Sequence, residues 1–223
     1  MDQTPTSIIV AAITQAIVDH RLAPGAKLGE QKLADHFGVS RTLVRQALFR
    51  LSQKRLITME PSRGAFVASP SPQEAQQVFA LRRVLELEMT RKFVAQLKPQ
   101  HIKALRQHLK LERAALQGHD PTGRNEMLGD FHVVMANLIG DKVLAEVLGD
   151  LISRCALVNL MQSSDDAGHS VDEHEELVQA LESRDAEKAT ALMAAHLDHV
   201  LASLSMQTSD TRPNPPAPAA TWP

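Results

Sequence analysis

Three histidines in the second half of the chain, His132, His174 and His196, each have apolar residues about one helical turn away. We therefore expect each imidazole to point inward from a different helix. A single inward histidine is more often a hydrogen-bonded core residue than a ligand, but three imidazoles without partners would strand several polar nitrogens in an apolar interior. A divalent metal would bind all three and leave a coordination position open for water or an anionic ligand. The apolar neighbours are Leu128, Met135, Ala136, Val171, Leu177, Val178, Leu192 and Val200.

A second group with binding chemistry is a cluster of cations between residues 41 and 63. The same segment contains a single acid, Glu60. Such a cluster on a small element is typical of a surface that binds phosphates, although a solvated basic face is the alternative when charge is the only evidence. Its members are Arg41, Arg45, Arg50, Lys54, Arg55 and Arg63.

The residues around these arginines predict a helix-turn-helix. Gly38 suits the left-handed residue that closes a helix, and Ser40 is a good N-cap for the next one. Arg41 and Arg45 lie one turn apart and project together near the start of that helix. Two helices joined by a three- to four-residue turn present base-edge donors in this way. The apolar spacing predicts helices over residues 9–20, 30–37 and 41–53.

The segments that follow predict a β-wing and then a helical bundle. Two short strands are expected over 56–59 and 65–68, with Arg63 at the tip between them. From residue 72 to 206 the periodicity is helical, with breaks at Pro99, 118–123, Gly140, 163–168 and near Arg184, which predicts about six helices. The first of these carries Val78, Leu81, Leu85 and Met89 on one apolar stripe. The predicted fold is mainly α.

Charge divides the chain into two parts. The formal net charge is −2, but residues 1–70 carry nine Lys/Arg and five Asp/Glu while residues 71–223 carry fifteen and twenty-one. The Ser-Pro-Ser-Pro stretch at 69–72 is an extended link. We therefore expect a DNA-binding domain over 1–70, a helical domain over 71–206 and, because five prolines follow, a disordered tail over 207–223.

Composition narrows the class of protein. Aromatic residues make up 3% of the chain, so functions that stack bases or sugars on rings are poorly supported. The single cysteine excludes an intramolecular disulfide framework and a cysteine-based zinc cluster. No apolar run approaches the roughly 18 to 20 residues of a membrane helix. We expect a soluble, cytoplasmic protein.

The first half of the chain resembles the winged helix-turn-helix of GntR-type bacterial transcription regulators. The resemblance rests on segments 22–30, 33–34, 38–48 and 63–67, in the right order and spacing. It implies DNA contacts by Ser40, Arg41, Arg45 and Gly64, with phosphate contacts by Thr42 and Arg63. Gln46 stands where that family usually has glutamate, and glutamine can also bind adenine.

The second half resembles the effector-binding FCD domain of the FadR/VanR-like branch. The resemblance rests on three short motifs, Asp130-Phe131-His132, Glu173-His174 and residues 194–197. The resemblance implies that the three histidines bind a divalent metal, zinc or nickel, together with an aspartate one turn before the first. That position is Leu128, and Asp130 should point about 200° away around the helix. Three histidines and solvent would then complete the site, because Glu126 or His199 could substitute only in a distorted helix.

Arg82 is the candidate for binding an effector carboxylate beside the metal. It matches an arginine in the family's Arg-x-x-Leu-Glu segment, and guanidinium favours carboxylate geometry. The alternative is an i,i+4 pair with Glu86 on a solvated edge. Arg154 is a second pocket candidate. The other histidines of this half are expected at the surface, namely His101, His108, His119, His169 and His199.

These features favour a homodimeric transcription regulator that binds an inverted-repeat DNA operator and responds to a small organic acid. Two alternatives remain. Three histidines on a metal with an open position could be catalytic, which would make the chain a helical metalloenzyme with an accessory DNA-binding domain. The bundle could instead be only a dimerisation module of an architectural DNA-binding protein.

Overall fold

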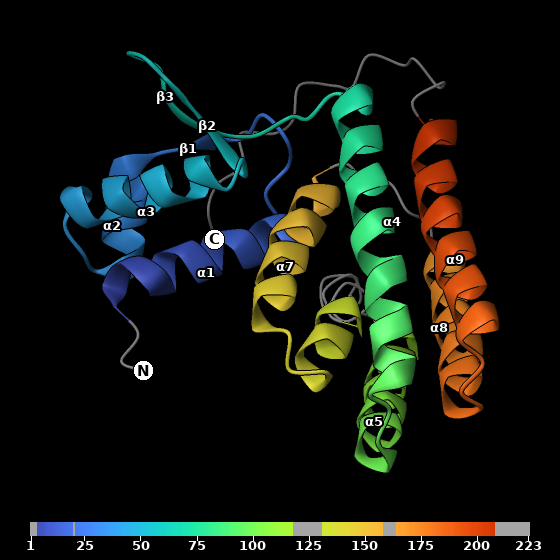
Figure 1. Ribbon diagram of the computed structural model, residues 1–223. Helices are drawn as coiled ribbons and strands as arrows, with labels where there is room; N and C mark the ends of the chain where they lie inside the picture. Colours follow the sequence, from blue (N-terminus) through green and yellow to red (C-terminus); the bar gives the residue numbers. More distant parts are fainter. Residues whose placement is uncertain (1–3, 20, 118–130, 158–163, 208–223) are drawn as a thin grey trace.

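The computed structural model describes residues 4–19, 21–117, 131–157 and 164–207. The winged domain lies at one side of a taller helical bundle, as Figure 1 shows. The predicted tail over 208–223 and the positions of His119, Glu126, Leu128 and Asp130 lie outside the described residues.

The N-terminal domain contains three helices and a small sheet. The helices are α1 (Pro5–Val18), α2 (Glu30–Phe37) and α3 (Arg41–Gln53). The wing strands β2 (Ile57–Glu60) and β3 (Gly64–Val67) lie within one residue of their predicted bounds. The sequence missed β1 (Lys27–Leu28), which pairs antiparallel with β3 to give the sheet order β1-β3-β2. A two-residue strand has no periodicity, so only its partner defines it.

The helical domain contains six helices within the described residues, as the sequence predicts. They are α4 (Pro72–Ala95), α5 (Pro99–Gln117), a short helix over 131–138, α7 (Lys142–Ala156), α8 (Ser164–Glu182) and α9 (Ala186–Gln207). The chain enters α4 through Ser71, whose hydroxyl accepts a hydrogen bond from the backbone of Glu74. The predicted break through residue 168 is wrong, because α8 begins at Ser164.

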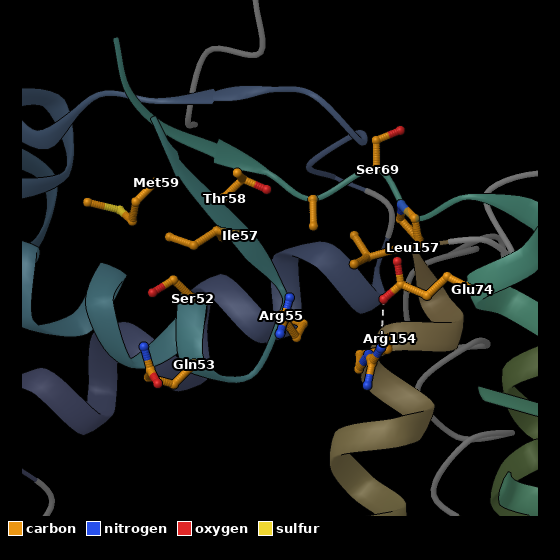
Figure 2. Close-up of a pocket in the computed structure, with 12 residues that line it drawn as sticks. Ser52, Gln53, Arg55, Ile57, Thr58, Met59, Ser69, Glu74, Arg154 and Leu157 are labelled. Atoms are coloured by element: carbon orange, nitrogen blue, oxygen red, sulfur yellow. Dashed lines mark hydrogen bonds and ion pairs between the residues drawn. The ribbon is translucent and has the colours of Figure 1, made fainter. Parts of the chain in front are cut away.

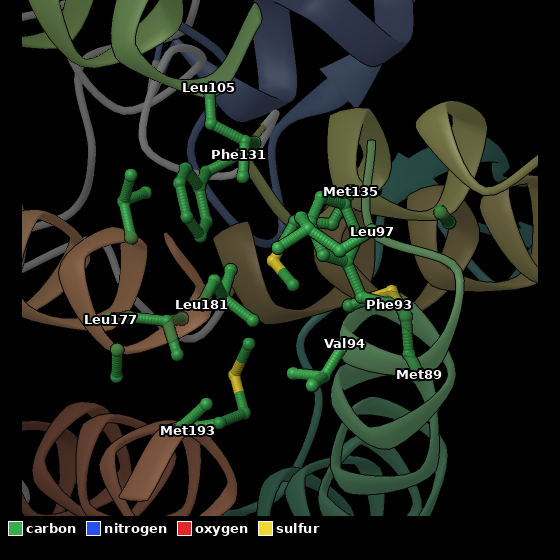
Figure 3. Packing of buried hydrophobic residues seen from close by; sticks show 14 of the residues in the cluster. Met89, Phe93, Val94, Leu97, Leu105, Phe131, Met135, Leu177, Leu181 and Met193 are labelled. Carbon is green, nitrogen blue, oxygen red and sulfur yellow. The ribbon is translucent and has the colours of Figure 1, made fainter. Parts of the chain in front are cut away.

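The core of the bundle lies between α4, α5, α8 and α9 and the short helix over 131–138. Figure 3 shows Phe93, Phe131 and Met193 packing there with their neighbours. Leu81, expected on the buried stripe of α4, is 47% exposed, whereas Arg82 and Glu86 are buried. The buried face of α4 therefore includes an ion pair, which an apolar pattern cannot reveal.

The two domains are packed against each other as well as linked. Leu157, just after α7, packs in the core of the winged domain, and α1 contacts α7. Lys54 Nζ and Asp150 Oδ1, from α3's end and α7, lie 2.5 Å apart. The position of one domain is therefore tied to α7 of the other.

Candidate functional site

The turn between α2 and α3 is built by two local devices. Gly38 closes α2 with a left-handed φ of 63°, a conformation that glycine adopts at little cost. Ser40 caps α3, and its hydroxyl accepts a hydrogen bond from Leu43 N. The cap places Arg41 and Arg45 on the solvent side of α3, where their side chains are 56% and 63% exposed.

Glu30, at the start of α2, binds both of these arginines. Arg45 Nε donates to Glu30 Oε1 and Oε2 at 2.9 Å, and Arg41 Nη2 donates to Oε2 at 3.1 Å. The hydrogen bond from Arg45, with help from Arg41, lowers the pKa of Glu30 against the opposing effect of burial. The sequence alone did not predict that Glu30 pairs with these arginines, which lie 11 and 15 residues further along the chain.

The wing turn supplies a third cation to the same groove. Ser62 and Gly64 adopt positive φ angles of 60° and 103°, which reverse the chain between β2 and β3. Arg63 lies in an ion pair with Glu60 and over the Phe66 ring, 5.3 Å from its centroid. The groove between α3 and the wing is lined by four of the predicted DNA-binding residues, Arg41, Arg45, Arg63 and Gly64. Ser40, Thr42 and Gln46 are exposed outside this lining.

The three inward histidines meet inside the bundle, as the sequence predicts. His132 comes from the helix over 131–138, His174 from α8 and His196 from α9, and all three are buried. One ligand atom of each lies within 4.8 Å of the others. Their ring centroids are 4.7 to 5.4 Å apart.

Each of these imidazoles faces a different carboxylate through Nδ1. His174 Nδ1 lies 3.1 Å from both oxygens of Glu112, and His196 Nδ1 lies 2.8 Å from Glu173 Oε2. His132 Nδ1 lies 2.5 Å from Glu86 Oε2, at an angle outside good hydrogen-bond geometry. Carboxylates on the distal nitrogen orient imidazoles that bind a metal through Nε2.

The chemistry of this centre fits a divalent metal. His174 Nε2 is buried without a hydrogen-bond partner. Burial lowers the pKa of His132, and it lowers that of His196 to about 3, so these imidazoles are neutral, the form that binds metals. Burial alone would raise the pKa of each of the three facing carboxyls. At Glu86 the Arg82 charge and His132 outweigh burial, and at Glu112 and Glu173 the neighbouring imidazoles do, so all three pKa values are lowered.

Arg82 contacts the three-histidine centre through Glu86. Its Nε donates to Glu86 Oε1 at 2.7 Å, so the predicted i,i+4 pair exists. The expected solvated edge is wrong, because both side chains are buried. Arg82 Nη1 also lies 3.7 Å from the Sγ of buried Cys155. Packing of α4 against α7 and α9 covers the pair.

Arg154 lines a different space. It points into a cavity of about 500 Å³ between the two domains, together with Arg55 and Ser69, and donates to Glu74 at 2.6 Å (Figure 2). This cavity adjoins the link between the domains, whereas the three histidines lie within the bundle.

The remaining histidines divide between core and surface. His101 and His108 are buried, contrary to the sequence expectation. His101 packs against Phe93, with centroids 5.6 Å apart, and His108 Nε2 lies 3.3 Å from Glu112. His169 is exposed and His199 is half-buried. The signal in the sequence that His108 could be buried is Glu112, one turn later, which gives that ring a buried partner.

Family comparisons match both halves of the chain. Residues 5–67 match the bacterial regulatory proteins of the gntR family, and residues 77–199 match the FCD domain. Among the described residues, none of the helices has the length and apolar character needed to cross a membrane.

The relatives span nearly the whole chain. An HTH-type transcriptional regulator in an unstable DNA locus of Streptomyces ambofaciens is 31% identical over 196 residues, which cover 85% of this chain and 80% of that protein. The HTH-type transcriptional repressor RspR of Escherichia coli is 23% identical, covering 88% and 87%. The solved structure of E. coli McbR/YncC has the same fold, with a TM-score of 0.83 at 21% identity over 92% of this chain and 99% of that one.

These matches decide between a regulator and an enzyme. The family and the relatives are transcription regulators, not enzymes. The winged helix-turn-helix, the helical domain behind it and the match of that domain over more than half of the chain agree. The chain therefore belongs to the GntR family of bacterial transcription regulators, in the group that carries an FCD domain.

Proposed function

We propose that the protein is a cytoplasmic, homodimeric repressor that binds an inverted-repeat operator and responds to a small carboxylate. The observation that carries this proposal is the pair Arg41 and Arg45, exposed at the start of a capped α3 and facing a groove that ends at Arg63. A two-fold dimer would place two such helices in successive major grooves. Repression follows from similarity to RspR, a repressor by name.

The DNA contacts divide into two kinds. Ser40, Arg41, Arg45 and Gln46 would contact base edges from the first turns of α3, where short side chains and guanidinium groups reach into the major groove. Thr42 and Arg63 would bind phosphates, and Gly64 would let the wing backbone approach the duplex. Glu30 must release its two arginines for this to happen. The residues proposed as the DNA-binding domain are 1–70.

The helical domain over 71–206 would hold the metal and the effector. His132, His174 and His196 would bind zinc or nickel through Nε2, and the metal would offer an open position to an anionic ligand. Glu86, Glu112 and Glu173 would fix the three rings. Arg82 would act mainly by holding Glu86, because its guanidinium is already engaged within the protein.

The contacts between the domains suggest how an effector would change operator binding. Leu157 packs in the winged domain, and Lys54 pairs with Asp150 of α7. Arg154 binds Glu74 beside the link. A shift of α7 would therefore move α3, and a preference of about 1–3 kcal/mol between two arrangements changes operator affinity by about 5- to 150-fold.

The DNA-binding proposal is tested with an operator selected from random duplexes by the full-length protein. Arg45→Ala should weaken specific binding by about 1–3 kcal/mol, measured by fluorescence anisotropy at fixed salt. Arg91→Ala, an exposed arginine of α4 paired with Glu88, is the matched control and should bind normally. Unchanged binding by Arg45→Ala would remove it from the site.

The effector proposal is tested by thermal shift with small carboxylic acids, before and after chelator treatment. We expect at least one acid to raise Tm only when metal is present and to change operator affinity. If metal and acids leave both unchanged, the bundle is a dimerisation module of an architectural protein.

A further inference from the structure

A second group of ligand-bearing side chains lies outside the three-histidine centre, on the outer side of α8 and α9. His169 and Glu173 are one turn apart on α8, and His199 is on α9, which packs along α8. One ligand atom of each lies within 4.8 Å of the others. His169 is exposed, and the other two are half-buried, so the group faces solvent.

Glu173 serves the two groups with different oxygens. Its Oε2 accepts a hydrogen bond from His196 Nδ1 at 2.8 Å, within the buried centre. Its Oε1 lies 3.1 Å from His199 Nδ1 and 3.8 Å from His169 Nε2. The outer histidines therefore face a carboxylate oxygen that the inner centre does not use.

A solvated ion-pair cluster is the alternative explanation, with one protonated imidazole beside Glu173. Two observations favour a cation instead. His199 Nδ1 is buried but makes no hydrogen bond of good geometry, despite its 3.1 Å distance from Oε1. The His169 and His199 rings meet edge to face with centroids 4.7 Å apart. The two rings and Glu173 therefore bring two ring nitrogens and one carboxylate oxygen to one place, which is a set of metal-ligand atoms.

We propose that His169, Glu173 and His199 form a second, solvent-facing site for a divalent cation of the zinc or nickel class. Two imidazole nitrogens and one carboxylate oxygen suit these metals, and water would complete the coordination. Metal–ligand distances of about 2.0–2.2 Å place tetrahedral ligand atoms about 3.4 Å apart. Rotation of the exposed His169 ring closes the remaining gap.

The shared carboxylate would couple the two sites. A cation on Glu173 Oε1 withdraws negative charge from Oε2, which weakens the acceptor that orients His196. The two cations also repel each other. The outer site therefore fills second and binds more weakly than the inner one.

The test is calorimetric titration of the tag-free, chelator-stripped full chain with Zn²⁺ alone. We expect two equivalents per chain for the wild type, the second weaker, and one for His169→Ala/His199→Ala. His169 is exposed on α8 and His199 is half-buried on α9, and circular dichroism checks that the fold is retained. His36→Ala, in the winged domain, is the matched control and should keep two equivalents.

The outcomes separate the outer site from the inner one. Equal stoichiometry in the wild type and in His169→Ala/His199→Ala would overturn the proposal. A single wild-type equivalent that survives His174→Ala but is lost in His169→Ala/His199→Ala would support the outer site and refute the inner one.

Discussion

Arginine and glutamate pair in both halves of the molecule, but with opposite exposure. In the winged domain, Arg45 is 63% exposed where it meets Glu30, which is itself 19% exposed. In the bundle, Arg82 and Glu86 are 6% and 0% exposed. Water screens the first pair and leaves it free to exchange its acid for a DNA phosphate or base. The second pair is enclosed, so separating it would leave an uncompensated charge in the interior.

This difference separates charges that recognise a partner from charges that hold geometry. Glu30 keeps two arginines together at the surface without fixing them strongly. Glu86, Glu112 and Glu173 each face one buried imidazole and orient it. The carboxylates of the bundle therefore orient the ligands of a binding centre. In the winged domain, Glu30 holds Arg41 and Arg45 close together at the surface.

The largest expected effect is on stability. Glu86→Ala should lower the free energy of unfolding by about 3–5 kcal/mol, because it leaves the Arg82 guanidinium buried and unpaired. Urea unfolding at one protein concentration measures the change. The counterpart Glu30→Ala, whose arginine partners are more than half exposed, should cost about 1 kcal/mol or less. Equal losses from the two variants would contradict the comparison.

The next largest effect is on metal affinity, which tests whether the buried carboxylates orient the imidazoles. Glu112→Gln removes the charge that faces His174 Nδ1 and should weaken Zn²⁺ binding by about 10- to 100-fold. Competition with a chromophoric chelator measures it. Glu88→Gln, on the exposed face of α4, is the control and should leave the affinity intact. An unaltered affinity in Glu112→Gln would mean that this acid does not orient the ring.

A smaller effect is expected at the surface pair. Glu30→Gln frees Arg41 and Arg45 from a negative partner, so binding to non-operator DNA should tighten by up to about fivefold, the equivalent of one exposed ion pair. Anisotropy with operator and random duplexes gives both affinities, and their ratio should fall. Glu187→Gln, exposed on α9, controls for net charge. A ratio equal to that of the control would show that Glu30 does not restrain the arginines.

The smallest effect is a pH dependence of the same pair. Arg45 holds the pKa of Glu30 below its usual value of 4.5. A carboxyl with a lowered folded pKa stabilises the fold above its unfolded pKa and loses that contribution as the pH falls through the folded pKa. The stability difference between wild type and Glu30→Gln should therefore shrink as the pH drops below 4.5. Urea unfolding across this range measures it, and a difference that grows in acid would reverse the sign.

The DNA-binding half was predictable because its signals are local. Gly38 and Ser40 act within one turn of the backbone they cap, and α2 ends and α3 begins where these residues predict. Two features of this half escaped, β1 and the acid Glu30. Both depend on segments brought together from elsewhere in the domain, β3 for the strand and α3 for the acid.

In the bundle, the sequence could identify side chains but not their partners. Apolar neighbours were enough to predict that His132, His174 and His196 point inward. Each facing carboxylate comes from a different helix than its imidazole; Glu112, for example, is 62 residues from His174. His101 and His108 were expected at the surface, and packing against neighbouring helices buries them.

The sequence by itself determined the order of the helices and of the two wing strands, the family and the residues with binding chemistry, because helix caps, turns and apolar periodicity act over a few residues. Only the tertiary structure decided which charges are exposed and which are enclosed. Exposure and pairing depend on helices that are distant in the chain, and an Arg–Glu pair that is weak in water is costly to break in the interior. The division of labour between Glu30 and Glu86 is therefore a property of the fold.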